Sequence, residues 1–146
     1  MENKPQVKVG FGVMILKNNK VLLGKRHDDP QKASSALHGE GTWTMPGGKM
    51  HFGQTFEDEA ARETLEETGI IVDKSKFKLI SLTNDVVHDA HFITIGFLCE
   101  DFEGEPQVME PDEITKWEWF DLNSLPSPIY FPSEKVLKNY LSGKIY

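Results

Sequence analysis

The stretch from Thr55 to Gly69 constrains the fold most, because it carries the signals for both ends of a helix. Thr55 can accept a hydrogen bond from the first turn, and Asp58 stands three residues later, at the capping-box position. Acidic residues occupy the first turn, where the helix dipole favours negative charge. Gly69 stands where a glycine commonly ends a helix. We therefore predict a helix over residues 55–69.

Strand-like segments lie on both sides of this helix. Residues 7–17 and 21–26 flank Asn18-Asn19, a pair that tolerates left-handed backbone, so they are expected to form a β-hairpin. A short strand should end in the Pro46-Gly47-Gly48 turn, and residues 50–52 would add another. Beyond the helix the expected strands are 76–87, 92–102 and 114–122.

Two further segments complete the prediction for residues 1–146, which we interpret as one domain. Residues 28–42 are polar and contain Pro, Gly and Ser, which favours a binding loop or lid. An amphipathic helix is expected over 133–141, with four side chains facing inward: Val136, Leu137, Tyr140 and Leu141. Strands on both sides of a central helix indicate a mixed α/β or α+β layer fold.

Composition narrows the classes of function. The net charge of −7 argues against a nucleic-acid duplex as partner, since phosphate backbones favour basic surfaces. We expect a cytoplasmic protein without a signal peptide or membrane span. Cys99 lies in an apolar run and is expected to be a buried, inert thiol. The pair His88 and His91 is a weak zinc pattern, and the remaining histidines show no partner pattern.

The predicted helix crowds six acids between Glu57 and Glu67, with Arg62 as their one cation. At about 100° per residue, four of the carboxylates fall on one face, opposite Ala61, Thr64, Leu65 and Thr68, which would pack. The four are Glu59, Glu63, Glu66 and Glu67. A solvated acidic face is the simple interpretation. A bound divalent cation would explain better why such a helix tolerates like charges at i,i+4 spacing.

These residues resemble the signature of the Nudix hydrolases. Gly48 is followed, after thirteen residues, by Arg62-Glu63-Thr64-Leu65-Glu66-Glu67-Thr68-Gly69-Ile70. The resemblance implies an α/β/α sandwich with a mixed central sheet and a strand-loop-helix catalytic motif. Thr64 stands at a site that is usually apolar. Gln54 stands where the family has a glutamate that generally orients the arginine and the helix, so we expect retuned or weakened activity.

The resemblance also implies the roles of the site residues. Glu63, Glu66 and Glu67, with the carbonyl of Gly47, would hold Mg²⁺, with Mn²⁺ as a substitute, and one acid would act as base beside Arg62. Glu110 or Glu113 would supply a further ligand or base, although a polar loop is the simpler reading of that segment. Similar proteins are often homodimers.

The rest of the chain resembles the MutT-like nucleoside triphosphate diphosphatases, including those that act on thiopurine nucleotides, more than the ADP-ribose or dinucleotide branches. Phosphates would contact Lys25, Arg26, Gly48 and Lys49. A base would contact Thr44, Met45, Thr94, Tyr130 and Phe131, the last two having an equally plausible core role.

Three functions follow from these observations. The first is Mg²⁺-dependent cleavage of a small nucleoside or deoxynucleoside triphosphate to the monophosphate and pyrophosphate. The second is hydrolysis of ADP-ribose or a nucleotide sugar. The third, motivated by Gln54, is a catalytically weak sensor that binds nucleotides.

Overall fold

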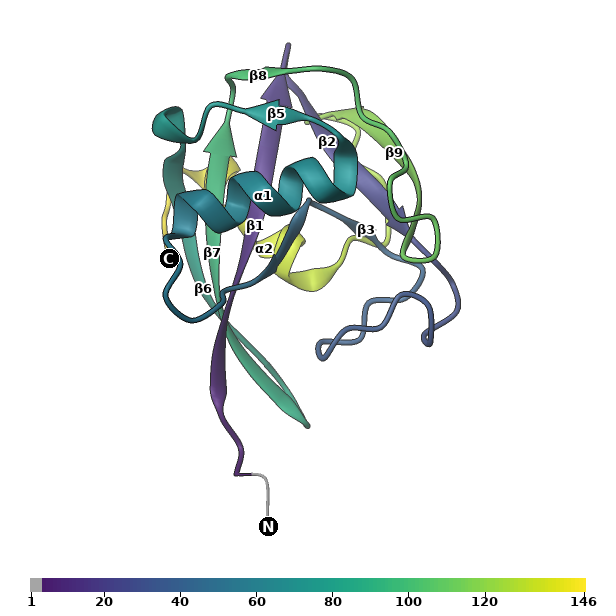
Figure 1. Ribbon diagram of the computed structural model, residues 1–146, viewed down its shortest axis with the longest axis vertical. Coiled ribbons are helices and arrows are strands. Elements are labelled where there is room, and N and C mark those ends of the chain that lie inside the picture. The colour runs from purple at the N-terminus through teal and green to yellow at the C-terminus, as the bar shows by residue number, and fades with distance from the viewer. Residues whose placement is uncertain (1–3) are drawn as a thin grey trace.

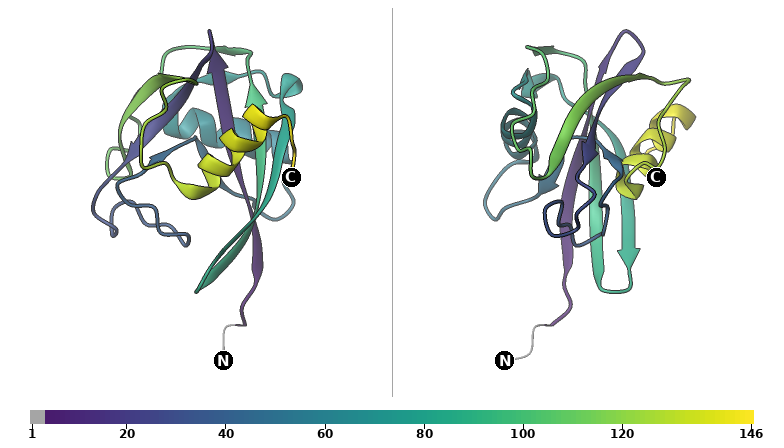
Figure 2. Two further views of the ribbon diagram at one scale, coloured as in Figure 1. Left: turned by 180° about the vertical axis from the view of Figure 1, so that it is seen from behind. Right: turned by 90° about the vertical axis from the view of Figure 1, so that its right-hand side faces the viewer.

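Two helices cover opposite faces of a central mixed sheet (Figures 1 and 2). The structure, a computed structural model, describes residues 4–146. The helices are α1 (Phe56–Thr68) and α2 (Phe131–Ser142), and a short 3-10 helix η1 spans Lys74–Lys76. The strands are β1 (Val7–Lys17), β2 (Lys20–Arg26), β3 (Trp43–Thr44), β4 (Gly47–Lys49), β5 (Ile71–Val72), β6 (Lys78–Val87), β7 (Ala90–Cys99), β8 (Phe102–Glu103) and β9 (Ile114–Asp121).

The strand order is β3-β2-β1-β7-β6, with β4 also pairing with β1 and β9 with β2. β1 and β7 are parallel from Val7–His91 to Ile15–Cys99, whereas the other pairs are antiparallel, so the sheet is mixed as predicted. β5 and β8 form a separate small sheet. The α/β/α arrangement implied by the sequence is confirmed.

The first hairpin forms as predicted and then opens. Asn18 and Asn19 both have positive φ, 53° and 63°, which matches a two-residue type I′ turn. β1 and β2 pair at Leu16–Val21 and Lys17–Lys20. Beyond these pairs they diverge, since β1 pairs with β7 and β4 while β2 pairs with β9 and β3 (Figure 1). The divergence leaves room beside the middle of β1.

Side chains of β1 alternate between two apolar cores. Phe11, Val13 and Ile15 pack in the core that includes Ala60 of α1. Met14 and Leu16 point the other way, into the core that includes Val136 and Leu137 of α2. Trp117 and Trp119 pack against the first core. Because β1 is buried on both faces, it fixes the positions of both helices.

The ends of α1 confirm the capping prediction in part. The Thr55 side chain accepts a hydrogen bond from the Asp58 amide at 3.1 Å, and Gly69 ends the helix with φ 77°. The Asp58 carboxylate pairs with Lys74 instead of returning to the cap. The predicted packing face is partly wrong: Leu65 is 47% exposed, whereas Glu59 is only 3% exposed. Relative to the predicted orientation, α1 is rotated about its axis, so that Glu59 is buried and Leu65 is exposed.

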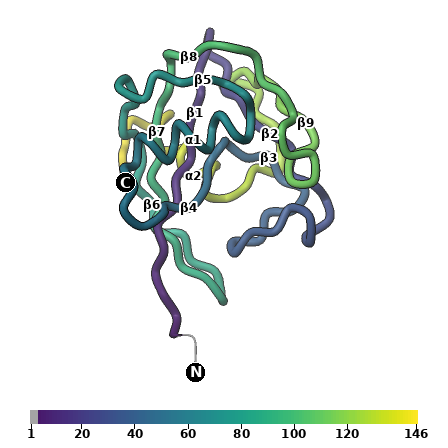
Figure 3. The backbone as a smooth tube through the Cα atoms, in the orientation of Figure 1, coloured from purple at the N-terminus to yellow at the C-terminus, as the bar shows by residue number. Residues whose placement is uncertain are grey.

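Four other expectations need correction. Residues 50–52 form no strand, and Gly47 and Gly48 lie inside β4 instead of in a turn. β4 runs beside β1 (Figure 3). α2 begins at Phe131, since Pro132 suits a first helical turn. Leu141 is 55% exposed, because the buried stripe of α2 ends with Leu137 and the half-buried Tyr140.

Replacing Leu22 with alanine is expected to lower the free energy of unfolding by about 2–5 kcal/mol, because Leu22 is fully buried and alanine leaves a cavity. Leu65→Ala is the matched control, with an expected change below about 0.5 kcal/mol. Chemical denaturation of both variants measures the difference. Equal losses would contradict the rotation of α1 described above.

Candidate active site

β4 passes between β1 and α1 because its glycines have no side chains. Gly47 lies opposite Gly12 and Gly48 opposite Phe11. A Cβ atom on Gly47 would lie 2.2 Å from the Phe11 carbonyl oxygen, and one on Gly48 would lie 3.1 Å from Cδ of Glu63. The close backbone approach thus brings β4 against the acidic face of α1.

Glu63 and Glu67 meet β4 at a shared pocket. The Gly47 amide donates a hydrogen bond to Oε2 of Glu67 at 3.0 Å. Burial raises the pKa of the Glu67 carboxyl well above its usual value, against the opposing effect of the Gly47 hydrogen bond. Burial also raises the pKa of Glu63, which the Arg62 guanidinium opposes. Both carboxyls therefore hold a proton, or a cation, more readily than exposed glutamates.

Arg62 binds three carboxylates of α1. Its Nη1 atom donates to both oxygens of Glu66 at 2.9 and 3.0 Å, and its Nη2 atom donates to Glu63 at 3.2 Å. Nη2 also donates to both oxygens of Glu59, at 3.0 and 3.1 Å. Glu59, predicted to lie on the open acidic face, is instead the buried partner of this arginine.

Gln54 does not hold Arg62. Its side chain is exposed and forms no hydrogen bond with any residue between 4 and 146. The expected orienting contact from position 54 is therefore wrong. The buried carboxylate that contacts the Arg62 guanidinium belongs to Glu59, five residues after Gln54.

The carboxylates of Glu63 and Glu67 are oxygen donors of the kind that a hard divalent cation prefers. Their side chains do not converge on one point with a third ligand among the described residues. Glu63 and Glu67 are oxygen donors whose charges are poorly compensated, and Mg²⁺ prefers such donors. Glu66 is half exposed and turned to Arg62. Within the described part of the chain, no three acidic, histidine or cysteine side chains converge closely enough to form a complete metal site.

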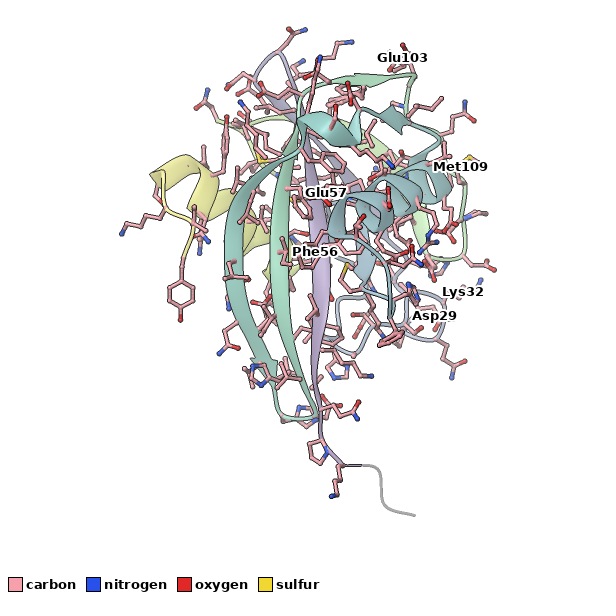
Figure 4. All side chains as sticks on the ribbon, turned by 60° about the vertical axis from the view of Figure 1, so that its left-hand side comes forward. Asp29, Lys32, Phe56, Glu57, Glu103 and Met109 are labelled. Carbon is pink, nitrogen blue, oxygen red and sulfur yellow. The ribbon has the colours of Figure 1, made fainter. Side chains whose placement is uncertain are left out.

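The segment 104–113, in which Figure 4 labels Met109, passes the end of α1 and carries Glu110 and Glu113. The Gln107 amide donates to the Thr68 carbonyl at 2.8 Å, which holds the segment against the helix. Glu113 lines the same pocket as Glu63. Burial, and then the charge of Glu113, raises the pKa of Glu110. Both residues thus lie near the predicted site, while their roles stay a prediction.

The pocket has a volume of about 450 Å³ and occupies the gap where β1 and β2 diverge. Seven of the residues predicted to bind substrate line it: Arg26, Thr44, Met45, Gly48, Lys49, Thr94 and Tyr130. Lys25 and Phe131 do not. The Lys25 ammonium donates to the Gly41 carbonyl, and Phe131 begins α2.

Comparison with known proteins identifies the family. A model described as the NUDIX domain matches residues 7–140. The chain belongs to the Nudix family.

Relatives and solved structures agree with this assignment. The ADP-ribose pyrophosphatase of Methanocaldococcus jannaschii is 34% identical over 131 residues, covering 90% of this chain and 71% of that protein. The oxidized purine nucleoside triphosphate hydrolase of Danio rerio is 34% identical over 120 residues, covering 78% of this chain and 66% of that protein. The MutT NUDIX hydrolase of Burkholderia pseudomallei superimposes with a TM-score of 0.80 at 30% identity, covering 92% of this chain and 98% of that one.

The protein is a Nudix pyrophosphohydrolase, an enzyme that acts on phosphoanhydride bonds. Nudix hydrolases generally use divalent metal ions. In the described part of the chain, neither helix has the length and apolar character needed to cross a membrane. The family assignment favours an enzyme over the catalytically weak nucleotide-binding sensor considered above.

Several residues of the Nudix pocket were missed by sequence reasoning. Ser133 is buried and accepts a hydrogen bond from the Met45 amide at 3.1 Å. Phe92 forms part of the wall, as do residues 33–37 of the predicted binding loop. Tyr130 shares a hydrogen bond of 2.8 Å with Ser35. The prediction of a binding loop over residues 28–42 could have indicated residues 33–37. Nothing in the sequence distinguished Ser133 from an ordinary serine in the first turn of a helix.

Arg26 is fixed at the pocket wall by the same loop. Its side chain donates to the carbonyls of Gly39 and Ala33 and lies 5.0 Å from the centre of the Tyr130 ring. The Tyr130 amide donates to the Trp43 carbonyl at 2.7 Å, so the strand β3 sets the position of the ring. An arginine stacked on an aromatic ring forms a flat, cationic surface.

Within residues 4–146 the histidines form no zinc site, and several of them have polar partners that the sequence did not indicate. His88 is largely exposed, and His91 contacts Asn84. His38 pairs with Asp89 at 2.9 Å, between the loop and the β6–β7 turn. His51 pairs with Glu59 at 2.6 Å. Cys99 is buried as expected, and burial raises the pKa of its thiol to about 11.

Glu67→Gln is expected to stabilise the metal-free protein at neutral pH. Since the native state binds the Glu67 proton more tightly than the unfolded chain, the free energy of unfolding falls as pH rises from the ordinary value of 4.5 through the raised native pKa. The variant lacks this loss, so thermal unfolding in EDTA should show a higher midpoint at neutral pH and no difference below about pH 4. A midpoint difference that is independent of pH would contradict the assignment.

Proposed function

We propose that this Nudix enzyme hydrolyses a nucleoside or deoxynucleoside triphosphate to the monophosphate and pyrophosphate, with Mg²⁺ as its metal ion. The observation that carries the proposal is the composition of one pocket. Its lining joins the carboxylates of Glu63 and Glu67 to a region of aromatic and hydroxyl-bearing side chains. A nucleotide has a matching division between charged phosphates and a flat base.

The base would occupy the region away from α1. Met45, Phe92 and Tyr130 supply apolar surface there, and the Arg26 guanidinium extends the flat wall. Thr44 and Ser133 supply hydroxyl groups that are themselves linked by a hydrogen bond of 3.3 Å. Planar rings between apolar walls with a few fixed polar groups are what a base-binding site requires.

The phosphates would lie between the cationic and anionic sides of the pocket. Lys49 lines the pocket next to Gly48, with its ammonium group 5.9 Å from the centre of the Phe92 ring. Lys49 and Arg26 can neutralise phosphate charge directly. The carboxylates of Glu63 and Glu67 repel a polyphosphate, because both groups are negatively charged. A cation is therefore needed between them.

Glu63, Glu66, Glu67 and the Gly47 carbonyl would hold Mg²⁺, and Mn²⁺ could replace it. When bound, the ion would neutralise phosphate charge and make water more acidic. Glu67 is the carboxylate we assign as the acceptor of the proton from the attacking water, since it is held by the Gly47 amide at the wall of the pocket. The water oxygen bonds to phosphorus, one phosphoanhydride bond breaks, and pyrophosphate and the monophosphate separate.

ADP-ribose is a second candidate substrate. The specific observation in its favour is the Methanocaldococcus jannaschii protein, named for that activity, which is as similar to this chain as the named triphosphate hydrolase of Danio rerio. The same carboxylates would serve both reactions. We place the triphosphate first because the pocket joins one aromatic region to the carboxylates, and a triphosphate needs no second sugar site.

A panel of nucleoside triphosphates, deoxynucleoside triphosphates, ADP-ribose and dinucleotide polyphosphates with Mg²⁺ separates the candidates. We expect the triphosphates to give the highest kcat/KM, with monophosphate and pyrophosphate as products. Chromatography of the products identifies the bond that is cleaved. Preferred release of ribose phosphate from ADP-ribose would replace the first candidate with the second.

Glu67→Gln is expected to lower kcat by about 10²–10⁴-fold, because the amide cannot accept the proton of the attacking water. Steady-state kinetics with the preferred triphosphate measures the loss. Glu57→Gln is the matched control, since Glu57 is exposed on the same helix and forms no ion pair with a described residue. Comparable activity of Glu67→Gln and the control would refute the role of Glu67.

A further inference from the structure

Glu59 is the one carboxylate of α1 that is almost fully buried, with 3% of its surface exposed. Its Oε2 atom lies 3.0 Å from Nη2 of Arg62 and 2.6 Å from Nδ1 of His51. Its Oε1 atom accepts from Nε of Arg62 at 3.3 Å and from Nη2 at 3.1 Å. A buried carboxylate is costly unless such partners compensate it, so this arrangement is specific.

The guanidinium of Arg62 is divided between this buried contact and the acidic edge of the pocket. Nε and Nη2 face Glu59, while Nη1 faces Glu66. One contact, at 3.2 Å, reaches Glu63. If Glu59 lost its charge, Glu63 and Glu66 would be the remaining anionic partners of Arg62 on this helix. The guanidinium, which already contacts both, could then bind Glu63 more fully and would compete with a metal ion for it.

We propose that Glu59, oriented by His51, is the positioning residue that holds the Nε and Nη2 atoms of Arg62, so that Glu63 keeps a single contact with the guanidinium and stays available for the cation. The inference deepens the proposed function and rests on it for the identity of the substrate. It assigns to a buried residue of the helix a role that Gln54, exposed and without a side-chain hydrogen bond among residues 4–146, does not fill.

The test compares Glu59→Gln with Glu57→Gln, because each removes one negative charge from the first half of the same helix. Glu59→Gln is expected to lower kcat by about 10–100-fold and to weaken Mn²⁺ binding by a similar factor, with KM changed by less than about threefold. Electron paramagnetic resonance measures free Mn²⁺ without any substrate. Glu57→Gln should keep both properties.

An Arg62→Gln background tests whether Glu59 acts through the arginine. If it does, adding Glu59→Gln to Arg62→Gln causes a further loss of less than about twofold, because the two changes remove the same interaction. Losses that multiply in the double variant would overturn the proposal. A larger loss for Gln54→Ala than for Glu59→Gln would also overturn it, since position 54 would then support the arginine.

His51→Ala keeps the proposal testable if Glu59→Gln fails to fold, as His51 is largely exposed. This variant should lower kcat and Mn²⁺ affinity in the same direction by a smaller factor. Full retention of both by folded variants at positions 51 and 59 would overturn the proposal. A substrate other than a triphosphate would overturn only the proposed function, because Mn²⁺ affinity is measured without substrate.

Discussion

The close approach of β4 to β1 is the constraint on which the site depends. With a Cβ at Gly47 only 2.2 Å from the Phe11 carbonyl, any side chain there would push the strands apart. The approach is what allows the Gly47 amide to reach Glu67 and places Gly48 against Glu63. The same pairing occupies the space that β2 leaves when it diverges from β1, and the pocket forms beside it.

The carboxylates on the acidic face of α1 are not all compensated by positive charge to the same extent. Arg62 compensates Glu59 and Glu66, and His51 adds a second contact to Glu59. Glu63 and Glu67 are left with weaker compensation in a partly desolvated position, so their ionised forms are disfavoured. Apolar residues at both positions would avoid this desolvation cost. Carboxylates at positions 63 and 67 are therefore better explained by a ligand on which their charges act.

The sequence predicted well those features that depend on neighbouring residues. The Asn18-Asn19 turn, the Thr55 cap and the Gly69 terminus are local, and each is found where expected. The rotation of α1 was predicted poorly, because it depends on the sheet and on His51. A helical wheel assigns Leu65 to the core, whereas the fold exposes it and buries Glu59.

In the site, too, the residues placed by local sequence were predicted well, and several of those placed by contacts between distant segments were not. A motif of fixed spacing located Glu63 and Glu67, but neighbouring positions in a strand point to different sides. Arg26 therefore lines the pocket while Lys25 turns to the Gly41 carbonyl. Ser133 enters the pocket because the chain before α2 pairs with Trp43, a contact across 87 residues from Trp43 to Tyr130. Two distant segments thus build the nucleoside end, whereas one continuous motif builds the phosphate end. Changes in the loop 28–42 or at the start of α2 can therefore alter which base is accepted while the carboxylates of α1 keep their chemistry.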